Sequence, residues 1–287
     1  MNNAIEIQQL TKHYKDFTLN NVSFSLPVGH IMGFVGQNGA GKTTTINLIL
    51  NMTERDGGEI KVLGLDNLRD EQKIKQDIAV VFDEVYFVDT WKINETEKAV
   101  KRFYSNWSGD SFRQYLTDFH LPADKRVNEL SRGMKVKLML AVAMSYDAKL
   151  LILDEPTSGL DPVARDELLE ILEAYIAGGQ KSILFSTHIT SDLEKVADYI
   201  TLIDNGSIFY SGTKENLLAS YCVVRGDSHD LTDAIRAKII GLKKTAGGFE
   251  ALLPVSDTKN LAPNIAAEAP SIDDILVAIS KGGRNLA

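Results

Sequence analysis

The residues with the clearest chemistry in this 287-residue sequence form a glycine-rich loop, Gly36-Gln37-Asn38-Gly39-Ala40-Gly41-Lys42-Thr43. The loop matches the pattern G-x-x-x-x-G-K-[ST]. Glycines allow several backbone N–H groups to turn towards one anion, and a helix that starts at the loop adds partial positive charge. The loop therefore predicts a nucleoside triphosphate site, in which Lys42 reaches the β- and γ-phosphates and the hydroxyl of Thr43 ligates Mg²⁺.

A chance match is the alternative, because average residue usage would give this pattern in roughly one chain in a hundred of this length. The flanking sequence argues against chance. The apolar run at residues 31–35 is typical of a buried strand, and Ile46, Ile49 and Leu50 follow the loop at helical spacing. A strand before the loop and a helix after it are what the motif requires.

Two carboxylates at the end of another apolar run form a second candidate site. Residues 150–153 are apolar and are followed directly by Asp154 and Glu155. In a parallel sheet the carboxyl ends of the strands open onto the ligand crevice. Asp154 is thus placed to hold Mg²⁺, usually through water, and Glu155 to accept a proton from an attacking water. The alternative is a buried strand with ordinary solvated acids at its exit.

Two later positions have weaker signals. Asp161 and Pro162 suit the N-cap and the first position of a helix. His188 follows an apolar run at residues 182–185, so it is expected on the crevice side of the sheet. A lone histidine is more often a packed or surface residue than a catalytic one.

Short apolar runs alternate with helical patterns along most of the chain, which predicts an α/β fold with a mostly parallel sheet. The predicted strands are residues 31–35, 78–82, 150–153, 182–185 and 200–203. Period-two alternation at Ile5, Ile7, Val22, Phe24 and Leu26 predicts an N-terminal antiparallel β unit.

Two segments depart from this alternation. Residues from about 86 to 146 contain no clear strand and are interpreted as a helical insertion, with Asp110 expected to cap a helix that carries Phe112 and Leu116. Beyond residue 220 the character changes again. Strands are expected at 221–224 and 249–253, and helices at 230–240 and 271–279, so the last part of the chain is interpreted as a small α+β appendage.

Composition limits the class of protein. The formal charge is −8 and the pI is about 5.2, which argues against nucleic acid or anionic lipid as the main partner. Cys222 is the single cysteine, so a disulfide framework and a cysteine-rich zinc site are excluded within one chain. No signal peptide is recognised at residues 1–6, and no apolar run reaches the length of about 18 residues that spans a bilayer. A membrane role would need another chain.

Taken in order, four motifs resemble the ATP-binding cassette (ABC) ATPase family, and in particular the nucleotide-binding subunits of ABC transporters. They are the phosphate loop, Leu130-Ser131-Arg132-Gly133-Met134, then Leu153-Asp154-Glu155-Pro156-Thr157-Ser158-Gly159-Leu160-Asp161-Pro162, and finally Ser186-Thr187-His188. The resemblance covers about residues 4–215. The segment 130–135 also resembles the antibiotic- and peptide-export branch of Gram-positive bacteria.

The resemblance implies a role for each matching residue. Tyr14 matches the aromatic that stacks on adenine, Glu155 the general base, and His188 a contact to the γ-phosphate and the attacking water. Ser131 and Gly133 match a signature that binds the γ-phosphate held by the other subunit of a dimer, and the loop around Asp161 crosses between subunits. The implied nucleotide contacts are Tyr14, Gly36, Asn38, Gly39, Ala40, Gly41, Lys42, Thr43, Thr44, Ser131, Gly133 and Asp161, and the implied metal contacts are Thr43, Asp154 and Asp83.

Three residues depart from the family pattern. Arg132 stands where the signature usually has glycine, and Met134 where it has glutamine, so Met134 cannot make the hydrogen bonds of that amide. Asp83 stands where a glutamine usually senses Mg²⁺. A carboxylate accepts hydrogen bonds but cannot donate like an amide, so Asp83 is expected to be a water-mediated Mg²⁺ ligand.

The resemblance therefore implies an ATPase subunit of an ABC transporter that dimerises on ATP and drives transport, in the export direction, through a separate membrane subunit at the cytoplasmic face of the membrane. Residues 1–220 would form the nucleotide-binding domain and 221–287 an accessory domain. One alternative is an ABC ATPase of translation or DNA repair, but those usually carry two cassettes or long coiled coils. Another is a different P-loop enzyme such as a kinase or GTPase, which would leave the signature unexplained.

Overall fold

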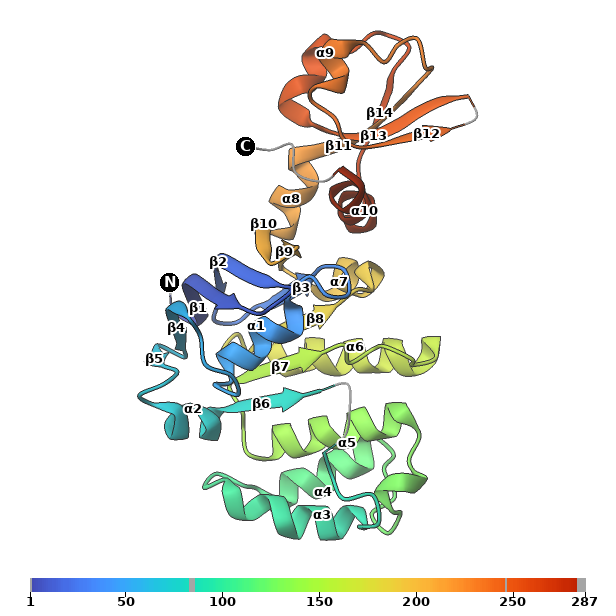
Figure 1. The fold of residues 1–287 in the computed structure, drawn as a ribbon. Helices are drawn as coiled ribbons and strands as arrows, with labels where there is room; N and C mark the ends of the chain where they lie inside the picture. Colours follow the sequence, from blue (N-terminus) through green and yellow to red (C-terminus); the bar gives the residue numbers. More distant parts are fainter. Residues whose placement is uncertain (1, 83–85, 246, 283–287) are drawn as a thin grey trace.

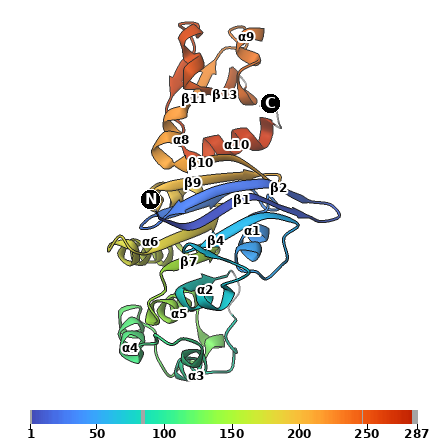
Figure 2. The same ribbon diagram turned by 90° about the vertical axis from the view of Figure 1, so that its left-hand side faces the viewer.

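A computed structural model of the chain describes residues 2–82, 86–245 and 247–282. The described part is elongated, with a sheet-rich middle, a helical unit at one end and a C-terminal unit at the other (Figures 1 and 2). The predicted class is confirmed: an α/β core with a mostly parallel sheet, an N-terminal antiparallel unit, a helical insertion and an α+β appendage.

The central sheet has the strand order β10-β9-β3-β8-β7-β6. Its strands are β3 (Ile31–Val35), β6 (Ile78–Val81), β7 (Leu150–Asp154), β8 (Ser182–Thr187), β9 (Tyr199–Asp204) and β10 (Ser207–Thr213). Neighbouring pairs from β9 to β6 are parallel, and β10 is antiparallel to β9. Alternate residues of β7 face different cores, because Leu151 and Leu153 pack on the side of the helical unit whereas Leu150 and Ile152 pack under the N-terminal sheet. Burial on both faces explains why these strands are continuous apolar runs.

The N-terminal sheet has the order β2-β1-β4-β5 and is antiparallel. Its strands are β1 (Asn3–His13), β2 (Thr18–Pro27), β4 (Gly57–Val62) and β5 (Leu65–Asp66). Ile5 and Ile7 are buried together with Val22 and Phe24, as the alternation predicts. This sheet covers α1 (Lys42–Ile49), the helix that continues from the phosphate loop (Figure 2).

Helices surround the sheet and build the insertion. They are α2 (Glu71–Asp77), α3 (Ile93–Val100), η1 (Lys101–Phe103), α4 (Gly109–Asp118), η2 (Val127–Glu129), α5 (Arg132–Ser145), α6 (Pro162–Ile176) and α7 (Thr190–Val196). The expected cap of α4 was wrong. Ser108 is the N-cap, and its Oγ accepts a hydrogen bond from the N–H of Ser111 at 3.1 Å, whereas Asp110 lies within the first turn.

The C-terminal unit has a sheet of order β12-β13-β11-β14 and a helix, α10, that packs on it. Its elements are α8 (Lys214–Ser220), β11 (Tyr221–Gly226), α9 (Asp233–Arg236), β12 (Ile240–Thr245), β13 (Gly248–Pro254), η3 (Val255–Asn260), β14 (Ala266–Glu268) and α10 (Ile272–Gly282). The helix expected at 230–240 is thus a single turn, and two strands were not foreseen. The start of α10 was foreseen: Ser271 and Asp274 cap each other's backbone N–H groups.

The parallel strands bring their carboxyl ends to one edge of the central sheet. Val35 is in register with Thr187, and Asp154 with Ser186. The phosphate loop, Asp154 and His188 therefore start from adjacent strand ends, which is the arrangement that places a ligand crevice in such sheets. Among the helices that the structure describes, none is long and apolar enough to cross a bilayer.

Candidate functional site

The phosphate loop joins β3 to α1 and has a backbone that requires glycine. A Cβ at Gly36 would lie 2.3 Å from the carbonyl oxygen of Ile203, so a side chain there would collide with the backbone of β9. Gly41 has φ +114° and is the residue that precedes the first turn of α1. L-residues rarely adopt that conformation, and it leaves the first N–H groups of α1 free to face an anion.

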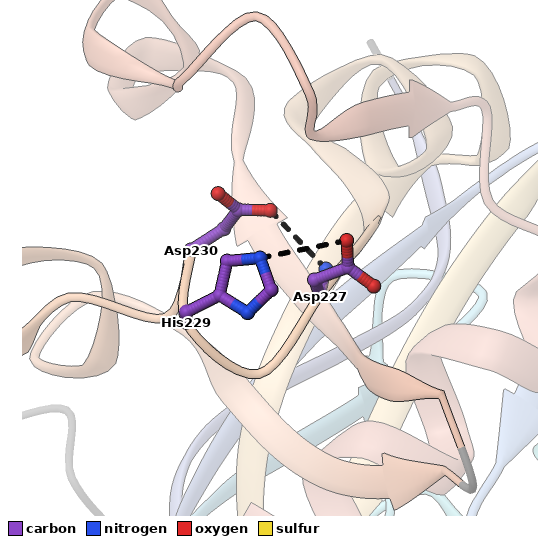
Figure 3. Close-up of side chains that lie close together, drawn as sticks. All are labelled: Asp227, His229 and Asp230. Carbon is purple, nitrogen blue, oxygen red and sulfur yellow. Dashed lines mark hydrogen bonds and ion pairs between the residues drawn. The ribbon is translucent and has the colours of Figure 1, made fainter.

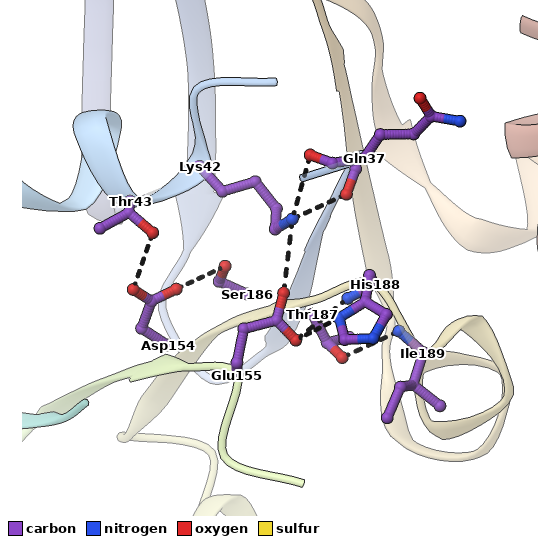
Figure 4. Close-up of polar contacts among 10 residues, drawn as sticks. Gln37, Lys42, Thr43, Asp154, Glu155, Ser186, Thr187, His188 and Ile189 are labelled. Atoms are coloured by element: carbon purple, nitrogen blue, oxygen red, sulfur yellow. Dashed lines mark hydrogen bonds and ion pairs between the residues drawn. The ribbon is translucent and has the colours of Figure 1, made fainter. Parts of the chain in front are cut away.

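The ammonium group of Lys42 is buried, with the side chain 6% exposed, and is surrounded by oxygen atoms. Its Nζ donates to the carbonyl oxygens of Gly36 at 2.7 Å and Gln37 at 3.4 Å, and lies 3.4 Å from Oε1 of Glu155 (Figure 4). A buried cation needs such acceptors. Phosphate oxygens are stronger acceptors than carbonyl groups, so Lys42 is positioned to exchange these partners for a phosphate.

A hydroxyl and a carboxylate face each other beside the loop. Thr43 Oγ1 donates to Asp154 Oδ2 at 3.0 Å, and Ser186 Oγ donates to Asp154 Oδ1 at 3.0 Å (Figure 4). Burial raises the pKa of the Asp154 carboxyl above its usual range, and the two hydrogen bonds oppose that rise. A buried carboxylate next to a hydroxyl is a hard oxygen donor set, the kind that Mg²⁺ prefers, so these residues fit that ion.

Glu155 is held in an unusual conformation. Its φ is +52°, in the left-handed region that non-glycine residues seldom occupy, and such strain is common at functional sites. Its backbone N–H donates to the carbonyl of Ser186 at 2.9 Å. Its Oε2 accepts from the backbone N–H of His188 at 3.3 Å and lies 2.8 Å from the ring Nδ1 of that histidine. The strain aims the carboxylate at the phosphate loop, between Lys42 and His188 (Figure 4).

A single cavity of about 700 Å³ brings most of the predicted nucleotide contacts together. Tyr14, 47% exposed, lies on its wall. Its lining residues are Tyr14, Asp16, Phe17, Gln37, Asn38, Gly39, Gly41, Lys42, Thr43, Thr44, Glu155 and Asn205. Asp16, Phe17 and Asn205 were not predicted. The Asn205-Gly206 pair is a strong hairpin signal after an apolar run and could have indicated that a turn lies near the loop.

Ser131, Gly133 and Asp161 form a second group outside the lining of that cavity. Ser131 caps α5 by accepting from the N–H of Met134 at 3.3 Å. Asp161 caps α6 by accepting from the N–H groups of Val163 and Ala164, both at 3.0 Å. The two helix N-termini touch, because a Cβ at Gly133 would lie 3.3 Å from Cβ of Ala164. The chain thus presents two positive helix ends side by side.

Comparisons with known proteins agree with this geometry. A family model described as ABC transporter matches residues 19–158. The Nod factor export ATP-binding protein I of Rhizobium meliloti (strain 1021) is 35% identical over 243 residues, which cover 80% of this chain and 72% of that protein. The chain belongs to the ABC transporter family. Within that family it is an ATP-binding ATPase subunit.

Two further relatives extend the likeness. The ABC transporter ATP-binding protein YtrB of Bacillus subtilis (strain 168) is 28% identical over 290 residues, covering 98% of this chain and 99% of YtrB. A solved structure described as the ATP binding subunit of an ABC transporter is 27% identical, with a TM-score of 0.68, and covers 75% of this chain and 91% of its own. The match to YtrB takes in the C-terminal unit of this ABC ATPase as well as its core.

One predicted residue and one side-chain cluster are not assigned to the ATPase site. Asp83, predicted as a metal contact, lies outside the described residues. Asp227, His229 and Asp230 have ligand atoms within 4.8 Å of one another, but they lie on a surface loop of the C-terminal unit (Figure 3). Exposed acidic groups of this kind are common without an ion, so we assign no site to them.

Asp154→Asn is expected to make this ABC ATPase more stable and less active. At neutral pH the folded protein carries a carboxylate that burial disfavours, so removal of the charge should raise Tm in Mg²⁺-free buffer, by about 2–4 °C for each kcal/mol gained. Because the folded pKa is raised, the penalty disappears as pH falls towards the ordinary aspartate range, and the gain should shrink near about pH 4. Thermal unfolding at neutral pH and at about pH 4 measures this difference in Tm, and Asp124→Asn, at an exposed position, is the control. An unchanged or lower Tm at neutral pH would contradict the expected cost of this charge.

Proposed function

We propose that two ATPase subunits bind two ATP molecules between them, head to tail, and that hydrolysis drives export through a separate membrane subunit. The observation that carries the proposal is the separation of two anion-binding surfaces on one chain. Lys42 lies in the cavity, whereas Ser131 and Gly133 lie at helix N-termini outside its lining. A second subunit would supply the missing helix ends to each cavity. Both surfaces of a chain are then used in a closed dimer with two-fold symmetry.

In this dimer the residues around Glu155 would carry out hydrolysis. Glu155 Oε2 accepts the proton of the attacking water, and His188, 2.8 Å away, orients that carboxylate and contacts the γ-phosphate. Lys42 and the loop N–H groups stabilise the charge of the transferred phosphoryl group. Mg²⁺ held by Thr43 and Asp154 would add a positive charge next to the phosphates. Loss of the γ-phosphate removes the group that both subunits hold, so the dimer opens.

The departures in the signature leave this scheme intact. Ser131 and Gly133, which would bind the phosphate, keep the family residue types. The Arg132 side chain lies near Gly159, where a Cβ would be 3.4 Å from Arg132 Cδ, so it packs on the loop that precedes α6. Met134 supplies the N–H that the Ser131 hydroxyl caps, a role that needs its backbone and not its side chain.

The membrane subunit would bind a groove between the central sheet and the helical insertion. A cavity of about 550 Å³ lies there, and its apolar rim includes Phe103, 73% exposed, and Tyr86, 71% exposed. Its lining residues are Leu50, Met52, Lys75, Ile78, Ala79, Val80, Phe82, Tyr86, Phe87, Val100, Phe103, Tyr104, Met139, Val142, Ala143 and Tyr146. An exposed apolar groove of this size suits an amphipathic helix of a partner.

The remaining parts of the proposal concern direction, place and organisation. The Rhizobium meliloti relative is named for export of Nod factor, and this supports an export direction. The subunit would lie at the cytoplasmic face of the membrane, held there by its partner. Residues 1–220 would form the nucleotide-binding domain and 221–287 the accessory domain.

Phe103→Glu tests the membrane partner. With the chain affinity-tagged in its own cells, we expect a polytopic membrane protein to co-purify with the wild type and to be lost from the variant, because a charge in an apolar groove is costly to bury. The ATPase rate of the purified variant should stay within about twofold of wild type, since Phe103 does not line the cavity at the phosphate loop. Val255→Glu, an exposed apolar position in the C-terminal unit, is the control. Co-purification of ribosomes or DNA in place of a membrane protein would contradict the proposal.

A further inference from the structure

Two helices begin just after loops of the ATPase site and pack against each other. The helix α6 begins after Asp161, the residue expected at the subunit boundary, and α7 begins two residues after His188. Arg165 lies one turn into α6, and its backbone N–H donates to the carbonyl of Asp161 at 3.0 Å. Asp192 lies in the first turn of α7. Any contact between Arg165 and Asp192 therefore links the subunit-boundary loop to the histidine.

That contact is an ion pair without a hydrogen bond, between a buried aspartate and a partly buried arginine whose side chain is 29% exposed. Asp192 is 2% exposed, and its Oδ1 lies 4.0 Å from Nε of Arg165. Within the described ranges, Oδ2 of Asp192 and Nε of Arg165 are buried without any hydrogen-bond partner. Buried charges that are close but not hydrogen-bonded are costly. A shift of about 1 Å would turn this pair into a charge-assisted hydrogen bond of about 2.8 Å.

The other sides of α7 are already fixed. Leu193 packs so closely on β3 that a Cβ at Gly33 would lie 2.7 Å from its Cδ1. On the side of the C-terminal unit, the N–H of Ile272 donates to Glu194 at 2.9 Å, where α10 packs on α7 (Figure 1). Towards α6, Lys195 of α7 already pairs with Asp166 at 2.6 Å, whereas the contact of Asp192 with Arg165 is left incomplete.

We propose that Asp192 and Arg165 are positioning residues that close onto each other when a second subunit engages the loop at Asp161. Closure draws α6 and α7 together and fixes the loop that carries His188, whose ring Nδ1 already lies 2.8 Å from Glu155 Oε2, so hydrolysis becomes fast when the dimer is formed. This inference rests on the proposed function, because it requires that His188 acts in hydrolysis.

Asp192→Asn in the full chain tests the pair, because asparagine keeps the shape but removes the charge. We expect kcat to fall about tenfold with the ATP dissociation constant unchanged, since misplacement by about 1 Å is enough to cost that much. The matched control is Asp166→Asn. Asp166 and Lys195 form a 2.6 Å ion pair between the same two helices, but an exposed one, so kcat should stay within about twofold of wild type.

Combining Asp192→Asn with His188→Ala shows whether Asp192 affects kcat through His188. If Asp192 acts through His188, Asp192→Asn should lower kcat no further in the His188→Ala background. Additive losses would overturn this inference alone. If His188→Ala itself keeps the wild-type kcat, the role of His188 in the proposed function is wrong, and the inference fails with it.

The double variant Asp192→Leu with Arg165→Met distinguishes a positioning role of the pair from a role in stability. It also keeps the proposal testable if the Asp192→Asn protein does not fold. Apolar residues in place of the buried Asp192 and the partly buried Arg165 should restore or raise Tm. We expect kcat to stay about tenfold low because the closing hydrogen bond is absent. A double variant with both Tm and kcat at the wild-type values would show that the pair serves stability, and would overturn the proposal.

Discussion

Replacement of Glu155 by glutamine is expected to lower the ATPase kcat by about 10²–10⁴-fold, the range that a positioned general base contributes. Glutamine has the shape of glutamate and can still accept a hydrogen bond from His188, but its amide cannot take the proton of a water at neutral pH. Its neutral side chain also no longer pairs with Lys42, which lies 3.4 Å from Oε1. The phosphate of ATP then no longer competes with the Glu155 carboxylate for the ammonium group of Lys42. ATP should therefore bind at least as tightly as to the wild type.

The same variant should accumulate as an ATP-bound dimer, because in the proposed dimer the γ-phosphate between the two subunits would not be removed. Size-exclusion chromatography with ATP, without ATP and with ADP measures this, alongside phosphate release. Glu173→Gln, on an exposed position of α6, is the control and should remain a wild-type enzyme. A Glu155→Gln protein that releases phosphate at the wild-type rate would mean that another group is the base.

The parts of the molecule predicted from the sequence are those whose signal is local. The strands β3, β7 and β8 are continuous apolar runs because both of their faces are buried, and the phosphate loop is a contiguous motif. Once these strands lie parallel in one sheet, their carboxyl ends must meet. That is why the sequence alone predicts Asp154 and His188 on the same edge of the sheet as Lys42.

The parts that were missed depend on contacts between distant segments. Asp16 and Asn205 enter the nucleotide cavity because two hairpins flank the loop; Asp16 carries no motif, and the Asn205-Gly206 signal predicts a turn but not its position beside the loop. The ion pair of Asp192 and Arg165 joins two helices whose own patterns indicate nothing more than amphipathic packing. In each case the residue type is ordinary and its partner lies far away in sequence, so the juxtaposition is created by the fold.

The C-terminal unit shows the same limit for secondary structure. The strand β12 carries Lys243 and Lys244, and β14 is exposed along its length, so neither has the apolar alternation that identifies a half-buried strand. The sequence from 230 to 240 has helical periodicity, yet the helix is limited to Asp233–Arg236. After that turn, Ile239 and Leu242 pack into the small core of this unit, and β12 begins at Ile240. Tertiary packing overrides the local preference there.

Mixing two inactive variants should restore activity if each ATP site is shared between subunits. Lys42→Ala removes the ammonium group from the phosphate loop, and Ser131→Arg places a bulky side chain on the helix end proposed to cover the partner's ATP. Each variant alone should lose about 10²-fold or more of its ATPase rate. In a mixed dimer, one site combines the intact Lys42 of the Ser131→Arg chain with the intact Ser131 of the Lys42→Ala chain, so that site is undamaged. With random pairing, half of the dimers hold one such site, so an equal mixture should recover about a quarter of the wild-type rate.

The amount of recovery separates the shared site from a site within one chain. If Ser131 acted on the ATP bound by its own chain, each mixed dimer would contain two damaged sites, and the mixture would be as inactive as its components. Loss of the α5 cap is a separate effect of Ser131→Arg, worth about 1 kcal/mol. Ser108→Ala removes the cap of α4 by the same chemistry and should lower Tm with little change in ATPase rate. If the mixture recovers activity and Ser108→Ala remains active, the loss of ATPase rate in Ser131→Arg comes from the phosphate contact. A misfolded Ser131→Arg subunit could not supply an intact Lys42 site to the mixed dimer.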